Sequence, residues 1–167
     1  MRITIWAVAL LSIGVIEAAQ RAAVATRAAQ PEPPADFELY LETDCPADTI
    51  DTGAGEFRRL VGLNEVVRAT VPLEPAKRAQ LFRMVTDARL FDYPTKYNPP
   101  WEGGFVVPYP HYTIRVVAAG RQHTIGWGAI RVPNAEAQRL SEFIQAAYAM
   151  FRQEPAVLAL PAAQPCR

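Results

Sequence analysis

The histidines are the first side chains to consider for chemistry, and the sequence has two of them. His111 and His123 fall on opposite arms of what reads as a β-hairpin, so their rings could approach each other. A zinc site would also need nearby carboxylate or thiolate ligands, and none has suitable spacing. We therefore predict no metal site, a sheet position for His123, and an exposed contact position for His111 in the segment PYPHY.

Acidic side chains gather in the segment ETDCPADTID, residues 42–51. Calcium needs six or more oxygen ligands arranged around one loop. The segment has neither the spacing nor the central glycine of the helix-loop-helix calcium motif. We expect a solvated loop here.

Candidate nucleophiles are also poorly placed. Ser12 lies in an apolar N-terminal run, and Ser141 lies in a helical segment outside any Gly-x-Ser-x-Gly turn. The glycine patches at residues 53–55 and 103–104 lack the lysine and hydroxyl residue of a phosphate-binding loop. The sequence predicts no catalytic residue and no cofactor, which favours a protein that is not an enzyme.

The least usual segment is PTKYNPPWEGGFVVPYPHY, residues 94–112. A loop of this length inside a compact domain is often functional. Its prolines lower the entropy cost of binding, and exposed aromatic side chains are typical interface anchors. Two interpretations stay open: a binding loop, or a lid whose aromatic rings cover the core. For the first, the candidate binding residues are Trp101, Phe105, Tyr109 and His111.

Alternating apolar residues predict the strands. Residues 37–42 place Phe37, Leu39 and Leu41 on one face, and a second β-like run covers residues 64–71. Residues 44–56, rich in Asp, Thr and Gly, are predicted to be a loop. Residues 112–119 and 121–127 alternate on either side of Gly120 and predict a hairpin.

Two segments have helical periodicity. Pro75 suits a first helical position, and this helix is expected to end near Leu90 because Pro94 cannot continue it. Asn134 is a suitable N-cap for a second helix of about 18 residues with an apolar stripe. The fold class is therefore α+β: an antiparallel sheet of about four strands with two amphipathic helices on one face, in the order ββαββα. The other sheet face, solvated or a contact surface, is predicted to carry Tyr40, Arg68 and Arg115.

Three segments together resemble a known group of proteins. They are VPLEPAKRAQLFRMVTDARLFDYP, HYTIRVVAAGRQHTI and the closing helix that follows Asn134. In this order they are similar to emfourin-type inhibitors of protealysin-like metalloproteases and to related small secreted bacterial domains. The resemblance covers about half of the expected mature chain and is carried by fold-level features. It implies an α+β fold and, as a more specific expectation, protease inhibition.

The N-terminus has the pattern of a secretory signal peptide. Met1-Arg2 precedes an uncharged run over residues 3–16, shorter than the ~20 residues of a transmembrane helix. Small residues at 23–25 (Ala-Val-Ala) offer a cleavage site. We predict a signal peptide at residues 1–25, a Pro/Ala-rich linker at 26–35, one domain at 36–159 and a tail at 160–167. An uncleaved anchor and a first helix of the fold are the alternatives.

Export would place Cys45 and Cys166 in an oxidising compartment, where disulfides persist. We predict a bond between them; two free thiols and an intermolecular bond are the alternatives. Closing a loop of about 120 residues would stabilise the fold by up to about 4–5 kcal/mol on a chain-entropy argument.

Charge and composition limit the partners. The chain has 17 basic and 17 acidic residues among 167. This balance argues against a nucleic-acid partner, and membrane contact is expected only if the N-terminal segment is uncleaved. The leading hypothesis is a secreted or periplasmic binding module that contacts a protein of the envelope or extracellular space, with protease inhibition as its specific version. An anchored envelope assembly factor and an enzyme of unrecognised type are the alternatives.

Overall fold

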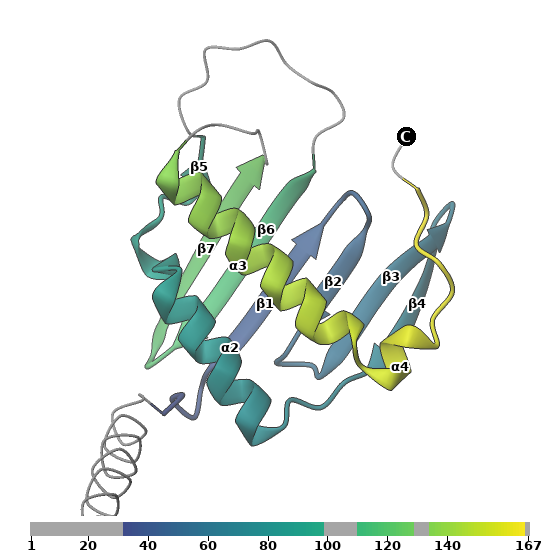
Figure 1. Ribbon diagram of the computed structural model, residues 1–167, viewed down its shortest axis with the longest axis horizontal. Helices are drawn as coiled ribbons and strands as arrows, with labels where there is room; N and C mark the ends of the chain where they lie inside the picture. The colour runs from purple at the N-terminus through teal and green to yellow at the C-terminus, as the bar shows by residue number, and fades with distance from the viewer. Residues whose placement is uncertain (1–31, 99–109, 129–133, 166–167) are drawn as a thin grey trace, which may run out of the picture. The chain divides into compact units, whose positions relative to one another are not determined.

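A seven-stranded sheet forms the centre of the protein (Figure 1). The computed structural model describes residues 32–98, 110–128 and 134–165. Residues 33–167 form one unit, separate from residues 1–32. The strands are β1 (Glu38–Thr43), β2 (Asp48–Asp51), β3 (Glu56–Gly62), β4 (Glu65–Thr70), β5 (Lys96–Tyr97), β6 (His111–Ala118) and β7 (Arg121–Gly128). Their order in the sheet is β4-β3-β2-β1-β6-β7-β5.

The α+β class is confirmed, but the details of the predicted sheet are wrong. The sheet has seven strands rather than about four, and it is mixed because β5 pairs parallel with β7. The remaining neighbours are antiparallel. The hairpin predicted on either side of Gly120 is confirmed as β6 and β7.

Four helical segments accompany the sheet within the residues that the structure describes. They are α2 (Pro75–Asp87), the short 3-10 helix η1 (Leu90–Asp92), α3 (Ala135–Arg152) and α4 (Pro155–Leu158). The prediction of two helices therefore missed the two short ones. The long helices α2 and α3 lie side by side on the same face of the sheet (Figure 1).

The two long helices begin where the sequence predicts. Pro75 is the first residue of α2, and the Asn134 side chain accepts hydrogen bonds from the backbone N–H groups of Glu136 and Ala137. α3 has the predicted 18 residues. α2 ends at Asp87 rather than near Leu90, because Arg89 has a left-handed backbone (φ 55°) and a new 3-10 turn starts after it.

The core lies between the sheet and α2 and α3. Leu39 and Leu41 on β1, and Phe37 directly before it, are buried as predicted. The apolar stripes of both helices are buried against them, and the largest fully buried side chains include Phe57, Leu81, Ile114, Ile125, Leu140 and Phe151. We call this side of the sheet the helix face and the opposite side the open face.

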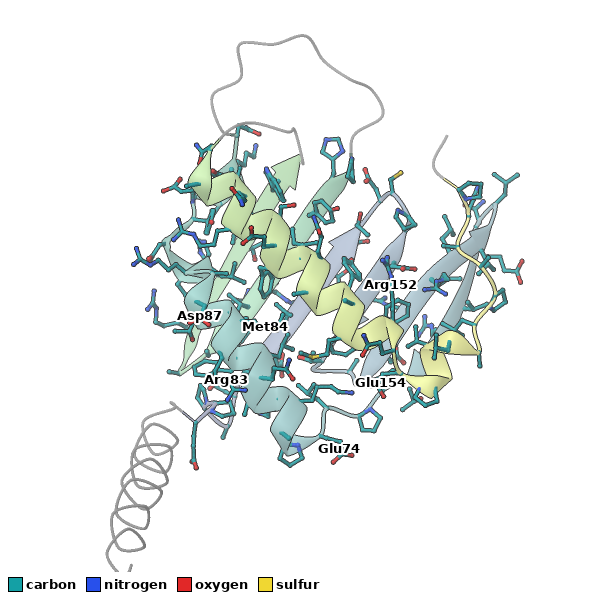
Figure 2. All side chains as sticks on the ribbon, viewed as in Figure 1. Glu74, Arg83, Met84, Asp87, Arg152 and Glu154 are labelled. Carbon is teal, nitrogen blue, oxygen red and sulfur yellow. The ribbon has the colours of Figure 1, made fainter. Side chains whose placement is uncertain are left out.

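The interpretation of residues 44–56 as a loop is wrong, because β2 lies inside it. Asp48 is only 1% exposed and faces α3. Its carboxylate accepts hydrogen bonds from Arg59 Nε at 2.9 Å and from Arg152 Nη2 at 2.9 Å. Figure 2 labels Arg152 at the end of α3. A carboxylate held by two guanidinium groups can be buried, so the strand forms without an apolar alternation.

Candidate functional site

The predicted binding residues fall in different parts of the chain. Trp101, Phe105 and Tyr109 lie outside the residues that the structure describes. His111 is described and is the first residue of β6. The structure therefore leaves open whether residues 94–112 form a binding loop or a lid on the core.

His111 is exposed, as predicted for a contact residue, and is held by Asp44. The two side chains meet at 3.1 Å between His111 Nδ1 and Asp44 Oδ2, and the His111 backbone N–H donates to Asp44 Oδ1 at 2.7 Å. Asp44 N–H in turn donates to the His111 carbonyl at 3.2 Å. The pair fixes the start of β6 against the end of β1.

His123 lies in β7, so the prediction of a sheet position is confirmed. Its Nε2 is 2.7 Å from the Tyr93 carbonyl oxygen, and its ring lies 6.3 Å from that of Phe91. The ring is thus bound to the segment around η1. Within residues 32–98, 110–128 and 134–165, no cluster of His, Cys, Asp and Glu could hold a metal ion.

The strand register brings polar side chains together on the open face. Tyr40 on β1 lies directly opposite Arg115 on β6 and Asp51 on β2. The next residue of β1 on this face, Glu42, lies opposite Thr113 and Thr49. All the described helices that pack on the sheet do so on the helix face (Figure 1), so these polar residues line the other side.

Tyr40 is the centre of the candidate site, which we call the Tyr40 platform: Tyr40, Glu42, Asp51, Arg58 and Arg115. The guanidinium carbon of Arg115 lies 5.3 Å from the centre of the Tyr40 ring, and that of Arg58 lies 5.9 Å from it. These are cation–π distances. The Tyr40 hydroxyl donates to Glu42 Oε2 at 2.9 Å, and Arg58 Nη2 lies 4.0 Å from Asp51 Oδ2.

The platform is suited to recognition rather than to proton transfer. Burial raises the pKa of the Tyr40 hydroxyl, and the Glu42 carboxylate adds to this effect, so the phenol stays protonated near neutral pH. The guanidinium groups of Arg58 and Arg115 offer only donors. The cluster can therefore donate to carboxylate or carbonyl oxygens of a partner while the ring packs against it.

Arg68, the third open-face residue that the sequence predicts, lies directly opposite the platform residue Arg58 in the pairing of β3 with β4. It is on β4, where its Nη1 is 3.5 Å from Glu56 Oε2 on β3. Sequence analysis missed Arg58 and Asp51 as members of the site because it placed no strand between residues 44 and 63. The usable signal was the alternation of the polar residues Glu56 and Arg58 with the apolar Phe57 between them.

A small pocket lies elsewhere, between η1 and the start of α3. It has a volume of about 140 Å³ and is lined by Arg89, Asp92, Tyr93, Pro94, Glu136 and Arg139. The Tyr93 hydroxyl donates to the Glu136 carbonyl at 2.8 Å. Ligand sites for small molecules usually have roughly 300 Å³ or more, so this hollow is a weaker candidate than the platform.

The predicted disulfide remains a prediction. The described residues contain no free cysteine, and Cys166 lies beyond the last of them. Likewise, the predicted signal peptide at residues 1–25 falls in a range that the structure does not describe. No helix in the described part of the chain is long and apolar enough to cross a membrane.

Comparison with known proteins assigns no family to this chain. No protein family matches the sequence, and no curated protein matches it. The resemblance to emfourin-type inhibitors thus stays an expectation from the sequence.

Proposed function

We propose that this chain is a secreted or periplasmic binding module that recognises a protein through the open face of its sheet. The observation that carries the proposal is the Tyr40 platform, an aromatic ring with a guanidinium group on either side. Tyr and Arg are enriched among the residues that dominate binding energies at protein interfaces. The module acts by contact and not by catalysis.

The predicted loop residues extend this surface. His111 begins β6, and the strand alternation puts it on the same face as Thr113 and Arg115. A partner on the platform would therefore also meet the beginning of β6, which residues 94–110 precede. We propose that Trp101, Phe105 and Tyr109 contribute to the same contact.

The test uses charge reversal on the two faces. The whole chain serves as bait in an envelope extract, beside Arg115→Glu and the matched control Arg83→Glu, which reverses a charge on α2 (Figure 2). We expect Arg115→Glu to lose the captured protein and Arg83→Glu to keep it. Capture that is equal for all three baits would contradict the open-face assignment.

A second pair of variants separates the ring from its hydroxyl. Tyr40→Phe keeps the ring between Arg58 and Arg115 and removes the bond to Glu42. Tyr40→Ala removes both. If the ring is the anchor, Tyr40→Phe retains capture and Tyr40→Ala loses most of it; equal losses would assign recognition to the hydroxyl.

Protease inhibition is the more specific form of the proposal and rests on the sequence resemblance alone. It is tested by adding the purified chain to a protealysin-like metalloprotease and following peptide hydrolysis. Inhibition that Arg115→Glu abolishes would support both the activity and the site. If hydrolysis is unchanged when the purified chain is present in large excess, the protein does not inhibit this class of protease. The more general proposal of a binding module is then still tested by the capture experiment.

The proposal includes export and a Cys45–Cys166 disulfide. The tail is held near Cys45: Gln164 N–H donates to the Leu60 carbonyl at 2.8 Å, while Leu60 N–H donates to the Ala47 carbonyl at 2.9 Å. The described end of the tail and the segment that follows Cys45 thus both bond to one residue of β3, Leu60. Mass spectrometry of the protein recovered from cells tests this; an intact initiator methionine with two alkylatable thiols would contradict it.

A further inference from the structure

The two edges of the sheet differ in how they are protected. At one edge, β5 has two residues, Lys96 and Tyr97, and is too short to pair with a long strand. At the other edge, β4 has six residues, Glu65–Thr70, and the described residues add no strand beyond it. Unprotected edges invite pairing, and proteins usually block them with proline, lysine or a very short strand. β4 contains no proline and no lysine.

The hydrogen-bond pattern shows which backbone groups of β4 face outward. Val71 N–H donates to the Gly55 carbonyl at 2.7 Å, toward β3. Because alternate residues of an antiparallel strand point their N–H and C=O groups to opposite sides, Ala69 and Val67 also point toward β3. The N–H and C=O groups of Val66, Arg68 and Thr70 point to the free edge.

Exposed apolar side chains gather around the same edge. Among the described residues, the strongly exposed large apolar ones are Leu63 (85%), Val66 (51%) and Leu158 (70%). Leu63 is in the β3–β4 turn and Val66 is in β4. Leu158 ends α4, which contacts β4 and lies beside the end of that strand that leads to α2 (Figure 1).

We propose that the β4 edge pairs with the β4 edge of a second copy of this chain, antiparallel about a two-fold axis at Val67. With this axis, Val66 of each copy lies opposite Arg68 of the other copy. Both residues point their backbone N–H and C=O groups to the free edge, so the two copies can exchange hydrogen bonds there. An axis at Arg68 would instead oppose two arginines, which is unfavourable. The result is one continuous sheet across both copies.

The ends of the two strands complement each other in this arrangement. The axis at Val67 brings Leu63 level with the partner's Val71, at the strand end beside which the partner's α4 and its Leu158 lie. A stable interface buries at least about 1,000 Å², more than one strand's backbone supplies. The exposed leucines provide the additional apolar area, and an identical chain offers both of them in matching positions.

A cysteine at the axis tests the register directly. Opposed residues that do not exchange hydrogen bonds have Cα atoms about 4.5 Å apart, which permits a disulfide. Whole-chain Val67→Cys should form a covalent dimer under mild oxidation, while the matched control Gln122→Cys on β7 should not. Equal or slower cross-linking of Val67→Cys would overturn the proposed register.

A proline on the free edge tests the hydrogen bonds. Arg68→Pro removes an outward N–H from each copy without removing a bond to β3, whereas Arg68→Ala keeps that N–H. In sedimentation equilibrium of the whole chain, we expect the wild type to be a dimer. Two lost bonds should raise the dimer Kd of Arg68→Pro at least about tenfold, with little change for Arg68→Ala.

A further pair of variants covers the case in which Arg68→Pro does not fold by circular dichroism. Leu63→Lys places a charge within the apolar contact beside the partner's Leu158, and Gln122→Lys adds the same charge at a distance. We expect a weaker dimer for the first and an unchanged one for the second. A monomeric wild-type chain, or a dimer that Leu63→Lys leaves intact, overturns the proposal. Neither outcome bears on partner capture by the open face, so the two proposals fail separately.

Discussion

The strand β2 presents one aspartate to each face of the sheet, and the two are used differently. Asp48 on the helix face is 1% exposed and is held by Arg59 and Arg152, each at 2.9 Å. Asp51 on the open face is partly exposed; it accepts a hydrogen bond from the Ala54 N–H at 3.0 Å and only approaches Arg58, at 4.0 Å. Both aspartates meet arginine from other elements, yet only the carboxylate of Asp48 is closed to water.

This difference separates side chains that hold the fold from side chains available to a partner. A buried carboxylate with two guanidinium partners cannot be released without a large cost, so Asp48 ties β2 to β3 and α3. An exposed pair contributes little to stability, so Arg58 can exchange Asp51 for a group on another protein. Each prediction below tests one side of this contrast.

The largest effect is expected from Asp48→Ala. The change leaves two arginines facing each other without their shared carboxylate, and it should lower the free energy of unfolding by about 3 kcal/mol. Urea denaturation followed by circular dichroism measures this. The matched variant Asp51→Ala should cost less than about 1 kcal/mol. Similar losses for both aspartates would contradict the contrast between the faces.

The next effect concerns Tyr148 on α3, the buried counterpart of Tyr40. Its hydroxyl donates to the Asp48 carbonyl at 2.9 Å and lies 3.3 Å from the Leu41 carbonyl. Removal of this group in Tyr148→Phe should cost about 1 kcal/mol at neutral pH. Tyr40→Phe, which removes a hydroxyl from the open face, should cost less.

The pH dependence of the free energy of unfolding at high pH also distinguishes the two tyrosines. Burial, followed by the nearby Asp48 carboxylate, raises the pKa of Tyr148 far above its usual value. The unfolded chain then releases this proton first, so stability falls as pH rises above about 10, by up to about 1.4 kcal/mol per pH unit for one group. Tyr148→Phe should flatten this fall in urea titrations at high pH. An unchanged slope would show that Tyr148 ionises without unfolding.

A smaller effect on stability is expected for Arg58→Ala. Its ion pair with Asp51 is long and partly exposed, so the free energy of unfolding should change by less than about 1 kcal/mol. Capture of the partner should nevertheless fall, because Arg58 is one of the two cations beside Tyr40. Arg152→Ala should show the reverse, with lower stability and retained capture. Loss of capture in Arg152→Ala with the fold intact would contradict the assignment of Arg152 to stability and of Arg58 to binding.

The sequence predicted the elements whose residues alternate or repeat on their own. β1, the β6–β7 hairpin and α3 with its Asn134 cap all follow from local pattern. β2 and β3 do not, because Asp is a residue type common in loops, and Asp48 is buried through an arginine, Arg152, that lies 104 residues further along the chain. β5 was missed for a related reason, since a two-residue strand has no measurable period.

The candidate site was predicted only in part. Tyr40 and Arg115 were placed on the face away from the helices because both alternate with buried neighbours. Their approach to within 5.3 Å, and the addition of Arg58, depend on strand register, which pairing across the sheet determines. The assignment of Trp101, Phe105 and Tyr109 to a contact surface remains a prediction.

The smallest effect is expected for Asp36, an exposed aspartate that nevertheless has defined partners. Its carboxylate accepts the backbone N–H groups of Gly120 at 2.6 Å and Ala119 at 2.8 Å. Both residues have positive φ in the β6–β7 turn. The Gly120 hydrogen bond is the main cause that lowers the pKa of Asp36 below 3.8.

The sign of the pH dependence follows from that shift. A lowered pKa in the folded state means that the contribution of Asp36 is complete above the unfolded value and is lost as pH falls through the folded value. In an NMR titration, the Asp36 carboxyl and the amides of Ala119 and Gly120 should share one midpoint below 3.8. Asp36→Asn should remove that step from both amides. A midpoint at or above 3.8 would mean that exposure, and not the hydrogen bonds, determines how this carboxylate behaves.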